Sequence, residues 1–199
     1  MIIVKLGGSL YQSSHLKPWL KALANLAQHS SIIIVPGGGP FADNVRKAQD
    51  NYHFDDSTAH HMALLAMAQF GLLLTGISSD CQRFRYNESP IAANSVSVWL
   101  PDETLLAESE LVHSWDITSD SLALWLANKL NAEQLILVKS CDIPNDVSIP
   151  FLTKNGIIDA GFEQLYRSSP VTLQLINAAN HHLLQQSRHT SGTTKIDLS

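Results

Sequence analysis

Apolar residues along this chain occur in short, mostly apolar runs that alternate with longer stretches of helical spacing. The short runs predict buried strands, and they cover residues 1–6, 31–35, 72–74, 95–100, 134–138 and 171–176. The helical spacing predicts helices at residues 16–27, 41–49, 58–70, 119–130 and 178–186. A short segment at Lys195 and Ile196 comes after the last loop.

Strands and helices alternate through most of the chain, which is typical of α/β folds. We therefore predict a three-layer αβα sandwich around a largely parallel sheet, built as a single domain of residues 1–199. Residues 76–94 are the least periodic part of the sequence. A hairpin, a lid and a loop at an acceptor site are the open alternatives for them.

The helix predicted at residues 58–70 is apolar on nearly every side. Asp55, Asp56 and Ser57 offer an N-cap before it, and Gly71 offers an end. A helix that is apolar all round must be buried, either in the core or against another subunit. We therefore expect a homo-oligomer, a dimer or higher.

Composition narrows the class of protein. The chain has 199 residues, of which 45% are hydrophobic and 16% charged, so disorder is not expected. A net charge of −5 argues against nucleic acid as the main partner. Cys81 and Cys141 have no metal-like spacing, and we interpret them as reduced thiols. Without a leader pattern or an apolar stretch of about 20 residues, no membrane partner is expected and a cytoplasmic protein is predicted.

Two glycine-rich turns, Lys5-Leu6-Gly7-Gly8-Ser9 and Pro36-Gly37-Gly38-Gly39-Pro40, each come after a predicted strand and precede a predicted helix. Unpaired amides at a helix start, together with the helix dipole, favour an anion, and glycine lets the backbone approach a phosphate closely. The alternative for either turn alone is a tight connection without a ligand. An ammonium group inside an apolar strand is costly when unpaired, so Lys5 needs either a phosphate or a buried carboxylate.

Residues 37–42 also satisfy the loose dinucleotide pattern G-x-G-x-x-G/A, here after the second strand instead of the first. The acidic residue expected about 20 positions later would be Asp55 or Asp56, which are better explained as helix caps. The sequence contains neither a G-x-x-x-x-G-K-[ST] loop nor a G-x-S-x-G elbow. A dinucleotide-dependent oxidoreductase is therefore a weaker alternative.

Five motifs resemble, in order, those of the amino acid kinase family, which includes acetylglutamate, uridylate and isopentenyl phosphate kinases. They are Ile-Val-Lys-Leu-Gly-Gly-Ser-Leu at 3–10, Val-Pro-Gly-Gly-Gly-Pro-Phe-Ala-Asp at 35–43, Thr-Ser-Asp-Ser-Leu-Ala at 118–123, Leu-Ile-Leu-Val-Lys-Ser-Cys-Asp at 135–142 and Gly-Thr-Thr-Lys-Ile at 192–196. Within the family, residues 38–43 and 59–67 resemble the small kinases of methanofuran biosynthesis, which phosphorylate an aminomethylfuran phosphate.

The resemblance implies an ATP- and Mg²⁺-dependent phosphotransferase that acts on a small, phosphorylated acceptor. It implies an acceptor-binding half at about 1–115 and a nucleotide-binding half at about 116–199. The implied catalytic residues are Lys5, Asp120 and Lys139. The implied nucleotide-binding residues are Gly7, Gly8, Ser9, Lys139, Ser140 and Asp142, and the implied acceptor-binding residues are Gly37, Gly38, Gly39 and Asp43.

The sequence departs from the family at residues 139–144. The family commonly has Thr-Asp-Val-Asp-Gly there, whereas this chain has Lys-Ser-Cys-Asp-Ile-Pro and lacks the glycine. A nucleotide-binding protein of the same fold without catalysis is therefore a second alternative.

Several candidate side chains also have plain structural explanations. Lys139 could be a surface lysine, Asp120 could serve only the helix dipole, and Asp43 could be solvated. The adjacent pairs His60-His61 and His181-His182 point to different sides of a helix and are poor chelators, so no protein metal site is expected. We expect the three tryptophans Trp99, Trp115 and Trp125 to lie in the core.

Overall fold

The computed structural model describes residues 1–87, 90–144 and 147–188. In this part of the chain six strands form one sheet, in which every neighbouring pair is parallel. The sheet order is β3-β4-β2-β1-β5-β6. The strands are β1 (Ile2–Leu6), β2 (Ile32–Pro36), β3 (Cys81–Phe84), β4 (Val96–Trp99), β5 (Gln134–Lys139) and β6 (Thr172–Asn177).

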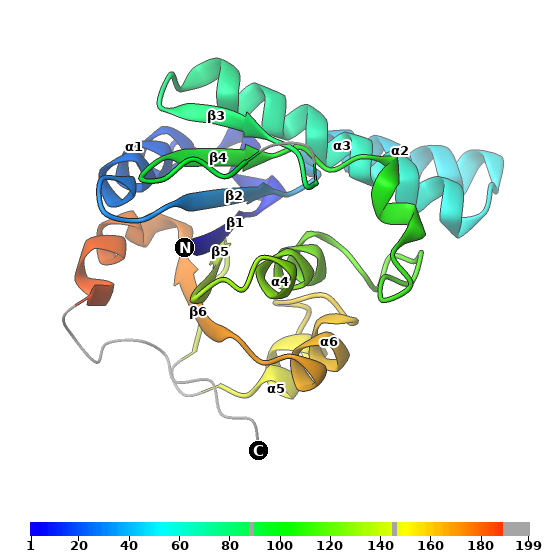
Figure 1. Ribbon diagram of the computed structural model, residues 1–199. Coiled ribbons are helices and arrows are strands. Elements are labelled where there is room, and N and C mark those ends of the chain that lie inside the picture. Colours follow the sequence, from blue (N-terminus) through cyan, green and yellow to red (C-terminus); the bar gives the residue numbers. More distant parts are fainter. Residues whose placement is uncertain (88–89, 145–146, 189–199) are drawn as a thin grey trace.

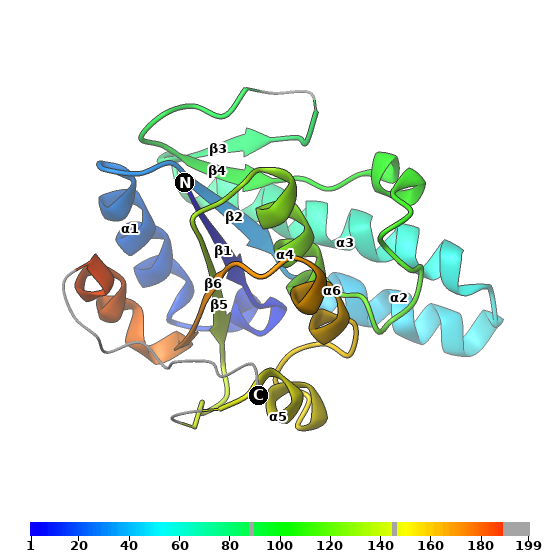
Figure 2. The same cartoon turned by 60° about the horizontal axis from the view of Figure 1, so that its bottom comes forward.

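Helices cover both faces of the sheet (Figures 1 and 2). The α-helices are α1 (Leu16–Ala27), α2 (Gly39–Tyr52), α3 (Asp56–Ile77), α4 (Ser119–Lys129), α5 (Ile149–Lys154) and α6 (Phe162–Ser168). Three 3₁₀ helices accompany them, η1 (Gly8–Gln12), η2 (Glu103–Ala107) and η3 (Ala178–Arg188). The predicted αβα sandwich with a parallel sheet is confirmed.

Strand β1 lies at the centre and divides the core in two. Because successive side chains of a strand point to opposite faces, Ile3 packs in the cluster that contains α4, α5 and α6. Val4 and Leu6 pack in the cluster that contains α1, η3 and the second half of α3. Lys5 therefore faces the same side of the sheet as α4, where the neighbouring buried side chains are apolar.

Helix α3 is longer than predicted. It runs without a break from Asp56 to Ile77, so the strand expected at residues 72–74 is wrong. Gly71 does not end the helix; a Cβ there would lie 2.6 Å from Leu100 Cδ2 and 3.2 Å from the carbonyl oxygen of Trp99. Gly71 instead lets α3 pack closely on the segment after β4. The N-cap was predicted correctly, because the Asp55 carboxylate accepts a hydrogen bond from Thr58 N at 2.8 Å.

At 22 residues, α3 is also long and apolar enough to cross a membrane by length and composition alone. The expectation that no apolar stretch reaches this length was therefore wrong. In this fold α3 packs on β2, β3, β4 and α2, as a core helix does.

Other differences concern short elements. Residues 76–94 contain β3, which pairs in parallel with β4, so the hairpin alternative is wrong. Helices α5 and α6 were not predicted. The helix expected at 178–186 is a 3₁₀ segment with non-helical backbone at Asn180. The segment at Lys195 and Ile196 and the motif at 192–196 lie outside the described residues.

Candidate functional site

The two glycine turns meet backbone to backbone at the carboxyl edge of the sheet. Gly37 N donates a hydrogen bond of 2.8 Å to the carbonyl oxygen of Leu6. A Cβ on Gly8 would overlap Gly39 N and lie 2.6 Å from Gly39 Cα, and a Cβ on Gly37 would overlap Gly8 N. Gly39 has a φ of +54°, which favours glycine. These backbone contacts by themselves exclude side chains at Gly8 and Gly37, so a bound ligand is not needed to explain the glycines.

The two turns lead into different kinds of helix. Gly38 is the N-cap of α2, so the second turn leads directly into an α-helix, as predicted. The first turn leads into the short 3₁₀ helix η1, and the α-helix α1 starts only at Leu16. The helix-dipole argument therefore applies to the second turn and only weakly to the first.

Beneath the turns, Lys5, Asp120 and Lys139 form a buried charge cluster. Their exposed fractions are 6%, 5% and 9%. Lys5 Nζ lies 2.8 Å from Asp120 Oδ1, and Lys139 Nζ donates a hydrogen bond of 2.5 Å to Asp120 Oδ2. Lys139 is thus not a surface lysine, and Asp120 does more than face a helix dipole. The structure brings all three predicted catalytic residues together.

Strand and helix geometry explains this meeting. Lys5 on β1 is paired in register with Leu137 on β5, and Lys139 lies two residues further on, so both lysines point to the α4 face. Asp120 stands in the first turn of α4, which crosses that face. Three elements distant in sequence therefore each contribute one charged group.

The lysines set the charge state of Asp120. Burial by itself raises the pKa of a carboxyl, but the charges of Lys5 and Lys139 outweigh it and lower the pKa of Asp120. Burial, with the repulsion from Lys5, lowers the pKa of Lys139, while Asp120 and then Asp159 act in the opposite direction. Two ammonium groups share one carboxylate, which leaves positive charge available to an anion.

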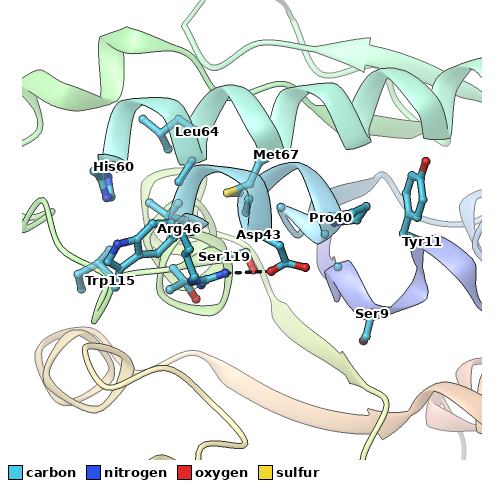
Figure 3. Close-up of a pocket in the computed structure, with 18 of the residues that line it drawn as sticks. Ser9, Tyr11, Pro40, Asp43, Arg46, His60, Leu64, Met67, Trp115 and Ser119 are labelled. Carbon is cyan, nitrogen blue, oxygen red and sulfur yellow. Dashed lines mark hydrogen bonds and ion pairs between the residues drawn. The ribbon is translucent and has the colours of Figure 1, made fainter. Parts of the chain in front are cut away.

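A cavity of about 480 Å³ opens beside the glycine turns. Gly8, Ser9, Gly38 and Gly39 line one end, and residues of α2, α3 and the segment before α4 line the remainder (Figure 3). Both turns face this same cavity, so the geometry does not divide them between two ligands.

The cavity wall carries opposite charges and an aromatic surface. Asp43 on α2 pairs with Arg46 at 3.3 Å, and the Arg46 guanidinium lies 4.1 Å from the ring centre of Trp115. Trp115 Nε1 donates a hydrogen bond of 2.7 Å to Gln49 Oε1. Trp115 is therefore a wall residue and the expectation that it lies in the core was wrong, whereas Trp99 and Trp125 are buried as expected.

A stacked pair of histidines lies at the cavity wall. His60 lines the cavity and stacks on His113, with ring centres 5.1 Å apart. Burial, then the neighbouring His113, lowers the pKa of His60, which favours the neutral ring. Within the described residues no group of three His, Cys, Asp or Glu side chains could hold a metal ion.

The predicted nucleotide loop lies across the sheet edge from the first turn. Ser9 and Ser140 share a hydrogen bond of 2.5 Å between their hydroxyl groups. Asn177, at the end of β6, donates to the carbonyl oxygen of Cys141 at 2.9 Å and approaches Asp142 Oδ1 at 3.5 Å. Ser140 and Asp142 are exposed, and the hydrogen bonds to Ser140 and Cys141 hold this part of the loop at the sheet edge.

Asp159 was not identified from the sequence. It lies between α5 and α6, and its carboxylate accepts hydrogen bonds from the first turn of α4, next to Asp120. Locally Asp159-Ala160-Gly161 resembles a helix cap, and its backbone carbonyl does accept from Phe162 N. That local pattern contains no signal for the contact with α4.

Comparisons with known proteins concern the family and the fold. Residues 1–104, just over half of the chain, match the model of the amino acid kinase family. A [5-(aminomethyl)furan-3-yl]methyl phosphate kinase of Methanocaldococcus jannaschii is 36% identical over 124 residues. That match covers 60% of this chain and 56% of the relative, so it spans little more than half of either protein.

Solved structures share the fold at low sequence identity. The uridylate kinase of Archaeoglobus fulgidus superimposes with a TM-score of 0.71 at 15% identity, over 96% of both chains. An isopentenyl phosphate kinase has a TM-score of 0.56 at 20% identity, over 94% of this chain and 95% of that one. The family model that matches more than half of the chain shows that this chain belongs to the amino acid kinase family, and the solved structures share its fold.

Proposed function

We propose that this protein is an ATP-dependent phosphotransferase that acts on a small, phosphorylated acceptor. The observation that carries this proposal is the buried Lys5–Asp120–Lys139 cluster, in which Lys5 lies beside the first glycine turn. Both glycine turns and Ser119, the residue before Asp120, line a cavity of about 480 Å³. Phosphoryl transfer requires positioning and positive charge against the moving group, and little covalent chemistry from the protein. The cluster supplies the charge and the turns supply the positioning.

Each predicted residue has a distinct role in this scheme. Lys5 and Lys139 stabilise the charge on the transferring phosphoryl group, and Asp120 keeps the two ammonium groups at a fixed separation. Backbone amides of Gly7, Gly8, Gly38 and Gly39 hold phosphate oxygens, whereas the Gly37 amide is already bonded to the carbonyl oxygen of Leu6 and contributes to the turn itself. Ser9, Ser140 and Asp142 contact the nucleotide. Mg²⁺ bound with the nucleotide phosphates neutralises further charge, and it needs few protein carboxylates.

We propose an aminomethylfuran phosphate as the acceptor class, because the relative that is 36% identical carries that substrate in its name. The acceptor phosphate would occupy the glycine end of the cavity. Asp43, which lines the cavity one helical turn away, would then receive the amine, and Trp115 and Arg46 would bound the ring. The expected setting is a one-carbon cofactor pathway in the cytoplasm.

The decisive experiment is a turnover assay. Purified protein is incubated with ATP, Mg²⁺ and [5-(aminomethyl)furan-3-yl]methyl phosphate, and ADP and the diphosphate product are measured. We expect turnover that Lys5→Ala abolishes, with the exposed Lys47→Ala on α2 as a matched control. If ATP raises the melting temperature but no acceptor in a panel of phosphate monoesters is phosphorylated, the protein is a nucleotide-binding member of the family without catalysis.

We also propose a homodimer formed through α2 and α3. Met62, Leu65, Leu72 and Ile77 on α3 are large apolar side chains with exposed fractions of 36–43%. Met62 and Leu65 border a groove with Phe41 and Val45 of α2. A second copy of this face would cover these side chains.

A further inference from the structure

Asp159 caps a helix to which it does not belong. Its carboxylate accepts hydrogen bonds from Thr118 N at 2.9 Å, Thr118 Oγ1 at 2.8 Å, Ser121 N at 3.0 Å and the Ser121 hydroxyl. Thr118 is the N-cap residue of α4, yet its own side chain makes no capping bond. The cap of α4 therefore comes from a residue about 40 positions later in the chain.

A second contact holds the same two segments together. Gly161 N donates a hydrogen bond of 2.7 Å to the carbonyl oxygen of Asp116. A Cβ on Gly161 would overlap Ile117 Cδ1 and lie 3.0 Å from that same carbonyl oxygen. The connection between α5 and α6 is thus packed directly on residues 116–121, without space for side-chain atoms between them.

The segment that Asp159 holds, residues 116–121, contributes both to the cavity wall and to the charge cluster. Ile117, Thr118 and Ser119 line the cavity, and the next residue is Asp120. A shift of this turn would move Asp120 relative to Lys5 and Lys139, and it would reshape the cavity wall at the same time. Geometric errors of about 1 Å at such positions are enough to reduce catalysis strongly.

Asp159 also contributes charge. The charged groups that face Lys139 are Lys5 from β1, Asp120 from α4 and Asp159 from the α5–α6 connection. Burial, followed by the charge of Asp120, raises the pKa of Asp159, whereas its bonds to Ser121 and Thr118 lower it.

We infer that Asp159 is a positioning residue for phosphoryl transfer: through its hydrogen bonds to Thr118 and Ser121 it fixes Asp120 between Lys5 and Lys139. This inference rests on the proposed function for its kinetic part. Its structural part, the place of Asp120 between the two lysines, concerns the protein alone and can be tested without turnover.

The test compares Asp159→Asn with two further variants. Asp159→Asn keeps the shape of the side chain but removes its charge and two acceptor sites. Ser121→Ala removes one hydrogen bond and leaves the charge. Ser148→Ala is the matched control, because Ser148 caps α5 by accepting from Phe151 N, and α5 carries no member of the cluster. Thermal melts and far-UV circular dichroism show that each variant folds.

Two readouts separate positioning from a purely structural role. With the aminomethylfuran phosphate, we expect Asp159→Asn to lower kcat at least about tenfold with a smaller change in the KM for ATP, and Ser148→Ala to leave both unchanged. In ¹⁵N-lysine-labelled protein, the Nζ signal of Lys139, assigned with Lys139→Arg, is expected to titrate at a lower pH in Asp159→Asn, because a displaced Asp120 carboxylate stabilises the ammonium form of Lys139 less. Ser121→Ala leaves that titration in place and lowers kcat only moderately.

The outcomes are distinct. If wild-type protein shows no turnover, the proposed function fails, and the lysine titration still tests the structural part. If Asp159→Asn folds and keeps the wild-type kcat, Asp159 is only a helix cap and the positioning role is wrong. If Lys139 titrates identically in both proteins, Asp120 has kept its place without Asp159, and the structural part is wrong. If Asp159→Asn does not fold, Ser121→Ala decides: an unchanged kcat there overturns the inference.

Discussion

Lys139 and Asp120 are 19 residues apart in sequence and form a buried hydrogen-bonded ion pair of 2.5 Å, which links β5 to α4 at the site. Lys5 joins the same carboxylate from β1. Removing a carboxylate and two ammonium groups from water is costly, and this protein nevertheless holds the three groups together next to the glycine turns. We interpret it as a binding device for anions that has structural consequences for the whole protein.

The first consequence concerns stability. Asp120→Asn leaves two buried ammonium groups without a counter-charge, and breaking a buried pair in this way costs about 3–5 kcal/mol of unfolding free energy. Urea unfolding followed by tryptophan fluorescence measures the change. Glu133→Gln, which breaks the exposed pair with the N-terminal amine, should leave the unfolding midpoint nearly unchanged. Equal effects of the two substitutions would contradict the importance of burial.

The second consequence is a dependence on pH. The folded protein holds the pKa of Asp120 below 3.8, so the unfolded chain binds the proton first as the pH falls. The contribution of Asp120 to stability is therefore complete above the unfolded pKa and is lost as the pH falls through the folded pKa. We expect the difference in unfolding free energy between wild type and Asp120→Asn to be constant above about pH 5 and to shrink below about pH 4. A difference that stays constant down to about pH 3 would refute this.

Alanine substitutions of Gly8 and Gly76 are expected to change the unfolding free energy in opposite directions. Gly8→Ala places a methyl group against the backbone of Gly39, and such overpacking costs about 1–3 kcal/mol of unfolding free energy. Gly76→Ala lies at an exposed position of α3 with nothing within 4 Å of the new Cβ, and it should add about 0.5–1 kcal/mol. Thermal melts of both variants check the pair. A tolerated Gly8→Ala would show that the two turns can separate.

Much of this architecture could be predicted from local sequence. Strands β1, β2 and β5 contain apolar runs of at least three residues, and β4 and β6 are apolar apart from a polar residue inside each, Ser97 and Gln174. Helix α1 has the periodicity of a helix buried on one side, so each of these elements can be recognised locally. Strand β3 cannot, because its two central residues, Gln82 and Arg83, are exposed. Helices α5 and α6 have only six and seven residues, too few to show a period, and they depend on packing against α4 and each other.

In the site, too, some contacts follow from the local sequence and others depend on tertiary packing. The side chains of Lys5 and Lys139 share one face of the sheet because of the two-residue period of strands, and that could be inferred once both strands were placed. The contact of Asp159 with α4 could not, because it depends on how a loop returns from α5. In the same way, Gly71 resembles a helix end in the sequence. Only the structure shows that it lies inside α3, where a glycine allows close packing against Leu100.

Acceptor binding provides a prediction on α2. If Asp43 receives the amine of the acceptor, Asp43→Asn removes a charge-assisted hydrogen bond and raises the acceptor KM about tenfold or more, with the KM for ATP unchanged. Asp50→Asn is the control, since Asp50 is exposed on the same helix and does not line the cavity. Steady-state kinetics with the aminomethyl acceptor and with its 5-methyl analogue measure the effect. If Asp43→Asn affects both acceptors equally, Asp43 does not recognise the amine.

The apolar face of α3 leads to a prediction about assembly. Met62 and Leu65 are partly exposed beside a groove of about 290 Å³ that is also lined by Phe41 and Val45. A charge on this face cannot be desolvated without a partner, so Leu65→Glu should convert a dimer into a monomer that keeps its fold. Phe151→Glu alters a side chain of similar exposure on α5, outside the proposed interface, and should leave the dimer intact. Sedimentation velocity over a range of protein concentrations distinguishes the species. A wild-type protein that is monomeric throughout that range would refute the proposed interface, because the exposed side chains of α3 would then need no cover.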